Sequence, residues 1–156
     1  MIRKLCAVCC AAIVLLFAGC TSSEQKNTEY LQSVRTSMTA ISDATEPFSA
    51  DLDAMFSSIT DDTKQKVLDD LAAMKTAYAS LSELEAPKDY EQVQALLEES
   101  ATQATAGIEI YETAIGDLSA STFNQSFVDA LAPGDEAMSQ AFAKLDEASA
   151  LLTNAE

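Results

Sequence analysis

Four pairs of carboxylates are the residues of this sequence with the clearest potential for chemistry: Asp51/Asp53, Asp61/Asp62, Asp69/Asp70 and Glu98/Glu99. Paired acids act in glycosidases and bind hard metal ions, provided that they converge in one cleft. These pairs fall on the polar faces of predicted helices or at a helix start, so we expect a solvated surface. Hydrolysis by one pair is a minor hypothesis, which would require a pair with a strongly raised pKa in a cleft.

Histidine is absent from the sequence, and so is tryptophan. Histidine is the commonest general base of enzymes and the commonest protein ligand of transition metals. Its absence excludes histidine triads, histidine metal sites and carboxylate–histidine di-iron motifs. The sequence also contains no glycine-rich phosphate loop and no G-x-S-x-G nucleophile elbow. We therefore predict a protein that is not an enzyme and that has no catalytic residue, no metal and no cofactor.

All four cysteines lie within the first 20 residues, at Cys6, Cys9, Cys10 and Cys20. This segment begins with the basic residues Arg3 and Lys4 and continues with an uncharged, mostly apolar run over residues 5–19. A basic start, an apolar centre and small residues at the end are typical of a secretory signal peptide. A transmembrane anchor is the alternative, but the run is shorter than the roughly 20 apolar residues that span a bilayer.

The end of this run carries the motif Phe17-Ala18-Gly19-Cys20, which resembles the lipobox of bacterial lipoproteins. In that family the cysteine thiol receives a diacylglycerol group, and cleavage before the cysteine makes it the first residue of the mature protein. The family usually has leucine where this chain has Phe17, which is also bulky and apolar. The resemblance implies a signal peptide over residues 1–19, lipidation of Cys20 and an anchored, extracytoplasmic protein. It implies nothing about the chain after residue 20.

Removal of this signal would leave a mature chain with no free cysteine, since Cys20 carries the lipid. A disulfide-stapled fold and a cysteine metal site are then excluded. The whole chain has a net charge of −16; without Arg3 and Lys4, seven basic and 25 acidic residues give −18. Such a surface repels nucleic acid and anionic lipid. We therefore predict no nucleic-acid partner, and attachment to the membrane through the lipid on Cys20.

The chain after the lipobox begins with a polar, aperiodic stretch, so we expect Cys20 and a tether over residues 20–29. An acidic helical domain is predicted over residues 30–156, because no segment alternates polar and apolar residues as a strand does. Apolar residues recur at steps of three and four in four segments, over residues 31–59, 67–84, 90–118 and 123–152. Thr60 is expected to cap the second helix.

These four segments predict an all-α fold, an antiparallel up-down-up-down four-helix bundle. We expect helix breaks near Pro47 and Pro133, because proline removes a hydrogen bond and clashes with the preceding turn. The small residues Ala101, Ala104 and Gly107 predict a close helix approach at the middle of the third segment. Three of these recurring apolar positions, the helix seams, hold the tyrosines Tyr78, Tyr90 and Tyr111. We expect these tyrosines to be buried, with their hydroxyls reaching outward for hydrogen bonds.

Pro47, Gly107 and Pro133 fall at about the same height of this predicted bundle. We therefore predict a local widening there, with a candidate pocket lined by Phe48, Ile108, Tyr111, Leu131 and Met138. Ordinary curvature at the prolines is the alternative explanation, since such kinks need no functional cause.

The functional expectation is a non-catalytic binding or interaction module of the cell envelope, with an envelope protein or a small apolar ligand as its partner. The alternative is an acidic, immunity-type surface lipoprotein that sequesters cationic peptides. Salt distinguishes the two, because binding by charge alone weakens as the Debye length shortens.

Overall fold

The computed structural model describes residues 22–154, and this part of the chain is helical with short connections. Its elements in chain order are α1 (Ser22–Ser57), α2 (Asp61–Ser82), the short 3₁₀ helix η2 (Lys88–Tyr90), α3 (Glu91–Gly116) and α4 (Gln125–Asn154). Residues 22–154 contain no strand, which confirms the all-α prediction. The cysteines and the Phe17–Cys20 motif lie outside the described residues.

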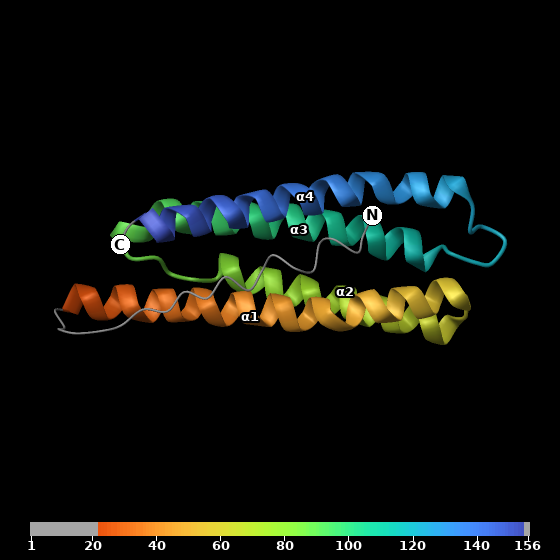
Figure 1. The fold of residues 1–156 in the computed structure, drawn as a ribbon, viewed down its shortest axis with the longest axis horizontal. Coiled ribbons are helices and arrows are strands. Elements are labelled where there is room, and N and C mark those ends of the chain that lie inside the picture. The colour runs from red at the N-terminus through yellow and green to blue at the C-terminus, as the bar shows by residue number, and fades with distance from the viewer. Residues whose placement is uncertain (1–21, 155–156) are drawn as a thin grey trace.

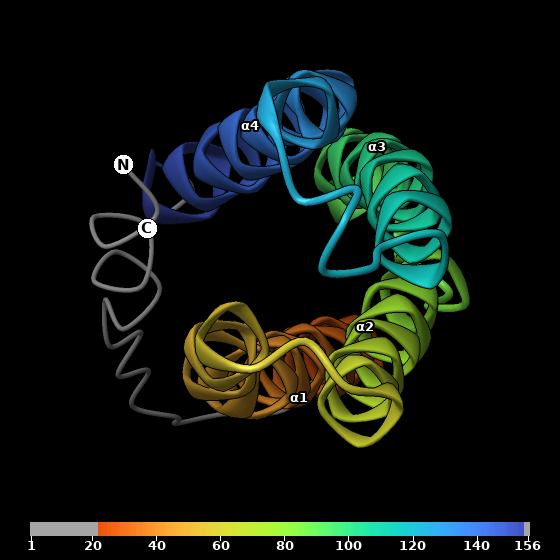
Figure 2. The same cartoon turned by 90° about the vertical axis from the view of Figure 1, so that its right-hand side faces the viewer.

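The four α-helices pack together lengthwise, and seen from one end they form an arc (Figures 1 and 2). Helix α1 packs on α2, α2 on α3 and α3 on α4, whereas α1 and α4 are not packed together along their length. The two outer helices of the arc therefore each have one long packed neighbour. Within the described residues, no helix is both long and apolar enough to cross a membrane.

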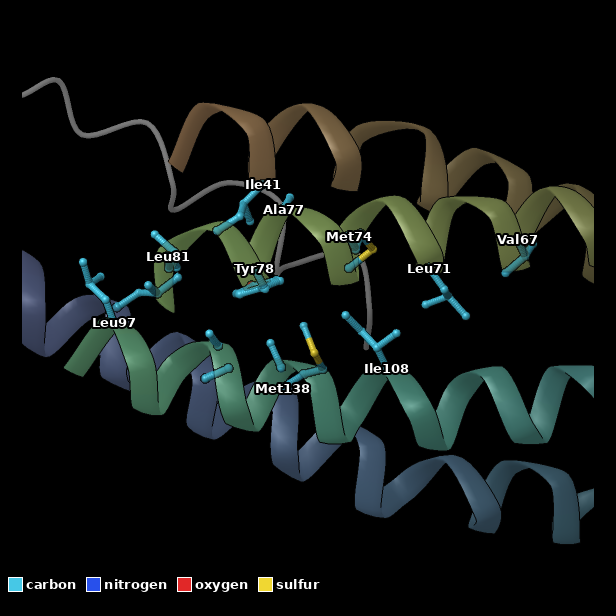
Figure 3. Packing of buried hydrophobic residues seen from close by; sticks show 14 of the residues in the cluster. Ile41, Val67, Leu71, Met74, Ala77, Tyr78, Leu81, Leu97, Ile108 and Met138 are labelled. Atoms are coloured by element: carbon cyan, nitrogen blue, oxygen red, sulfur yellow. The ribbon is translucent and has the colours of Figure 1, made fainter. Parts of the chain in front are cut away.

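The core lies mainly between α2 and α3, and α1 and α4 each contribute buried side chains from one side of it (Figure 3). The side chains of Leu71 and Leu81 from α2 and Ile108 from α3 are completely buried. Helix α2 begins with the predicted cap, in which the Thr60 hydroxyl accepts a hydrogen bond from the backbone N–H of Thr63 at 3.2 Å. The apolar steps of three and four thus predict the buried face of each helix well.

The predicted helix breaks near Pro47 and Pro133 are wrong, because α1 and α4 continue through these residues. Both prolines are exposed, so the backbone carbonyl that loses its N–H partner at each one can bond to water. The buried faces on either side of each proline stay packed, and this packing keeps the helix in one piece.

The predicted tether also differs from the structure, since α1 begins at Ser22 and its first turns fall within residues 22–29. Two side-chain contacts support a helix there. Gln25 donates to the carboxylate of Glu29 one turn later at 2.9 Å, and Asn27 donates to Asp89 at 3.1 Å. The contact with Asp89, next to the start of α3, ties the first turns of α1 to the rest of the fold.

Helices α3 and α4 approach each other closely where two glycines meet. A Cβ atom added to Gly107 would lie 3.0 Å from the carbonyl oxygen of Gly134, and one added to Gly134 would lie 2.6 Å from the ring of Tyr111. The Ser100 hydroxyl donates to the carbonyl oxygen of Ala141 at 2.9 Å along the same interface. The predicted close approach at the middle of α3 is confirmed.

Candidate functional site at the phenylalanine end of the bundle

Of the predicted pocket residues, Tyr111 and Met138 lie at this close approach. Ile108 and Met138 are buried, while Phe48, Tyr111 and Leu131 are half-buried. Because Tyr111 packs on Gly134 and Met138 packs on Gly107, the α3–α4 side of the predicted widening is closed. Phe48 lies on α1 and Leu131 on α4, the two helices that are not packed together along their length. A pocket lined by these five residues stays a prediction.

Tyr111 has a clear structural role at this position. Its hydroxyl donates a hydrogen bond to Asp135 at 2.6 Å. Burial and, after it, this bond to the carboxylate raise the pKa of Tyr111 far above its usual range. The hydroxyl therefore stays protonated, and the ring joins α3 to the first turn after Pro133. This is the outward-reaching tyrosine that the sequence predicts.

One carboxylate contact was not predicted. Asp51 of α1 and Asp70 of α2 belong to different sequence pairs, yet they meet across the α1–α2 interface. One oxygen of Asp70 is buried without a hydrogen-bond partner, and burial, followed by the charge and hydrogen bond of Asp51, raises the pKa of Asp70. The expectation that the carboxylate pairs form a solvated surface is thus wrong for this one oxygen of Asp70. Residues 22–154 contain no group of three or more acidic or cysteine residues that could hold a metal ion.

Three phenylalanines form a cluster at the end of the bundle where α1 stops and α4 starts. The ring of Phe56 in α1 stacks on Phe123 with centroids 5.3 Å apart and also meets Phe127 edge-on at 6.3 Å. Phe123 and Phe127 are 5.8 Å apart. This phenylalanine cluster therefore connects α1 with α4, which do not pack on each other elsewhere along their length.

Part of this cluster faces solvent. Phe123 is 45% exposed and Val128, next to Phe127 in sequence, is 51% exposed. We call the three contacting rings Phe56, Phe123 and Phe127, together with the exposed Val128 that follows Phe127 at the start of α4, the apolar end patch. Contiguous exposed apolar surface marks sites that bind other molecules, and aromatic side chains contribute much of the binding energy of interfaces.

The connection that carries Phe123 is held by its own hydrogen bonds. The backbone N–H of Ser119 donates to the Thr122 hydroxyl at 2.8 Å, and the N–H of Phe123 donates to the Ser119 carbonyl at 3.0 Å. The Asn124 side chain then accepts from the N–H of Ser126 at 2.9 Å and starts α4. Phe123 is therefore presented from a preformed turn, which lowers the entropic cost of binding.

The charges around the patch are mostly negative. Residues 53–66 and 115–130 contain the acids Asp53, Asp61, Asp62, Asp117 and Asp129 and the bases Lys64 and Lys66. Lys64 lies 3.7 Å from Asp61 and donates to the carbonyl of Gly116 at 3.4 Å. The segments that carry the apolar end patch therefore have five acids and two bases, a net charge of −3.

A second aromatic cluster lies near the other end of α1, where Tyr30 and Gln94 are buried and Tyr90 is half-buried. The hydroxyl of Tyr30 donates to Gln94 at 3.0 Å, and the amide of Gln94 donates to the carbonyl of Leu81 at 2.9 Å. The Tyr30 ring also lies 5.4 Å from that of Tyr90. Burial, with smaller effects of Glu98 and Tyr90, raises the pKa of Tyr30 to about 12. We call Tyr30, Tyr90 and Gln94 the tyrosine cluster.

The apolar end patch was not singled out by the sequence, where Phe123 and Phe127 count only as seam positions of the fourth helix. A signal was nevertheless present, because Phe123 stands in the polar stretch S-A-S-T-F-N-Q-S, before α4 begins. A large apolar residue in a polar connection has no helix seam to enter, so its exposure could have been expected.

Comparisons with known proteins give no assignment. No protein-family model, no curated protein and no solved structure matches this chain. Its function must therefore be inferred from its own residues.

Proposed function

We propose that this protein is a non-catalytic interaction module of the cell envelope, an extracytoplasmic lipoprotein anchored through Cys20 that binds a partner protein with its apolar end patch. The observation that carries this proposal is the exposure of Phe123 and Val128 on a preformed turn and helix start. Interfaces commonly derive most of their binding energy from a few such large side chains.

The proposal includes helices that alternate in direction, in an up-down-up-down arrangement. Two contacts support it. Tyr30, near the start of α1, bonds to Gln94, near the start of α3. Phe56, near the end of α1, contacts Phe127 at the start of α4. Helix α3 would then run in the direction of α1, and α4 in the opposite direction.

This arrangement presents the patch away from the lipid. Helix α1 has 36 residues, a length of about 54 Å at ~1.5 Å per residue. Cys20 precedes α1 by two residues, and the phenylalanine cluster lies at the opposite end of the helix. An anchored protein would thus hold the patch at a distance from its own membrane, where other envelope proteins can reach it.

The second candidate function is an acidic surface lipoprotein that sequesters cationic peptides. The net charge of −16 favours it, because such a surface attracts cations from all sides. Binding of this kind would disappear at high salt, whereas binding through Phe123 would largely persist.

Crosslinking in intact cells tests the proposed function. A photoreactive phenylalanine analogue at position 123 should capture one abundant envelope protein. The same analogue at Leu151, an exposed apolar residue near the other end of α4, is the matched control and should not capture it. Equal capture at both positions, or none at position 123, would contradict a binding role of the patch.

The anchor needs a separate test. Cys20→Ser should abolish lipidation and cleavage and release the protein from its normal membrane fraction, while the circular dichroism of the helical domain stays unchanged. Metabolic labelling with a fatty acid measures the first effect. Normal lipidation of this variant would overturn the lipobox assignment.

A further inference from the structure

On the basis of the proposed function, we infer that the apolar end patch recognises a basic amphipathic segment of its partner protein, in which an apolar side chain is flanked by lysine or arginine. The centre of the patch supplies the apolar contact and its surroundings supply the charge.

The apolar contact is provided by Phe123 and Val128. Phe56 stacks on the Phe123 ring at an angle of 24°, and Phe127 also packs against this ring, at an angle of 60°. Phe123 is still 45% exposed, so an incoming side chain can reach its exposed face. That face can accept an aliphatic or aromatic side chain by burial. It can also accept a guanidinium or ammonium group, because the ring face is electronegative.

The charged contact is provided by aspartates beside these residues. Asp129 follows Val128 directly and is exposed, and Asp53 lies one turn before Phe56 on an exposed face of α1. Asp129 accepts a hydrogen bond from Gln125 at 2.8 Å, which orders its carboxylate on the first turns of α4. A basic residue on either side of a bound apolar side chain would therefore meet a carboxylate.

Charge excludes several other occupants of this patch. A second copy of the chain would bring its own net charge of −16 to a surface that is already acidic. Anionic membrane surfaces and nucleic acids are repelled for the same reason. A free cationic peptide would be attracted by acidic residues all over the protein and would not require a preformed aromatic turn. These points favour a segment of a larger protein with a matching basic and apolar pattern.

Defined synthetic peptides test the partner class on the full mature protein. The probe is an amphipathic peptide of leucine, phenylalanine and lysine, and two matched peptides replace either all lysines by glutamate or all apolar residues by serine. Dissociation constants are measured by fluorescence anisotropy at low and high salt for the native protein and for Phe123→Ser, Val128→Ser and Leu151→Ser.

We expect the basic amphipathic peptide to bind and both matched peptides to bind weakly. Phe123→Ser should weaken its binding about tenfold or more, the range of an interface hot spot, and Val128→Ser should weaken it less. Leu151→Ser should leave it unchanged. Equal binding of the glutamate peptide overturns the inferred partner class.

The inference is also overturned if Phe123→Ser and Val128→Ser bind the basic peptide as the native protein does and this binding is lost at high salt. That result would indicate capture of free cationic peptides by diffuse charge. The proposed function fails separately, through the absence of position-specific crosslinking at residue 123. Crosslinking at that position without binding of the basic peptide would leave an interaction module that recognises a different kind of partner.

Discussion

The two aromatic clusters lie near opposite ends of α1 and are built in different ways. About 39 Å of helix separates Tyr30 from Phe56, at ~1.5 Å per residue. In the tyrosine cluster, Tyr30 is only 4% exposed, and hydrogen bonds join its hydroxyl through Gln94 to the Leu81 carbonyl. In the phenylalanine cluster, three rings meet without any polar atom, and Phe123 is 45% exposed.

This difference separates a structural role from a binding role. A buried tyrosine with a bonded hydroxyl has little to offer to a partner, and removing its partner costs stability. An exposed, prestacked phenylalanine gains free energy when another molecule covers it. Substitutions in the tyrosine cluster should therefore reduce stability, and substitutions of the exposed residues of the other cluster should reduce binding.

The largest effect on stability is expected from Gln94→Ala. This change leaves the Tyr30 hydroxyl and the Leu81 carbonyl without their partner in a buried site. Since each such loss costs ~1–3 kcal/mol, the free energy of unfolding should fall by about 2–4 kcal/mol. Urea denaturation followed by circular dichroism measures it. The exposed neighbour Gln92→Ala should stay within about 0.5 kcal/mol of the native protein, and equal losses in both variants would refute the structural role.

A smaller loss is expected from Tyr30→Phe, which keeps the ring contact with Tyr90 and removes one donor from Gln94. The free energy of unfolding should fall by about 1–2 kcal/mol. A variant as stable as the native protein would show that the hydroxyl contributes nothing in this site.

The same hydroxyl predicts a dependence of stability on pH. Because the folded-state pKa of Tyr30 is raised from 10.0 to about 12, the folded protein keeps this proton more strongly than the unfolded chain. Its contribution to stability is complete below pH 10 and is lost as the pH rises toward 12. The stability difference between the native protein and Tyr30→Phe should shrink over this interval, and a constant difference would contradict the burial of the hydroxyl.

The smallest change in stability is expected at the phenylalanine cluster. Phe123→Ser removes a ring that is already half exposed, so the free energy of unfolding should fall by only about 1 kcal/mol or less. Capture of the partner should nevertheless be lost. If this variant instead unfolded as readily as Gln94→Ala, the cluster would be part of the structural core and the contrast between the two ends would not hold.

Much of the fold follows from the sequence, because burial in long helices repeats every three or four residues. The cap at Thr60 and the glycine contact near Gly107 are likewise local patterns. The predicted breaks at Pro47 and Pro133 are wrong because both residues are exposed, and the cost of a lost hydrogen bond is small where water can replace it.

The arc and the candidate site depend on contacts between residues far apart in the chain. The same apolar periodicity fits a closed bundle and an arc in which α1 and α4 are not packed together along their length. Periodicity alone therefore could not decide between these two arrangements. The meeting of Asp51 with Asp70, and that of Phe56 with Phe123, require the register of two helices relative to each other. No spacing along one helix contains that information.

The most direct test of the binding role measures the affinity of the partner captured at position 123. The purified extracytoplasmic part of that partner should be titrated against the native protein, Phe123→Ser and Leu151→Ser at low and high salt. We predict that Phe123→Ser weakens binding about tenfold or more at both salt concentrations, while Leu151→Ser binds as the native protein does. Equal affinities for all three proteins would contradict a binding role of the apolar end patch.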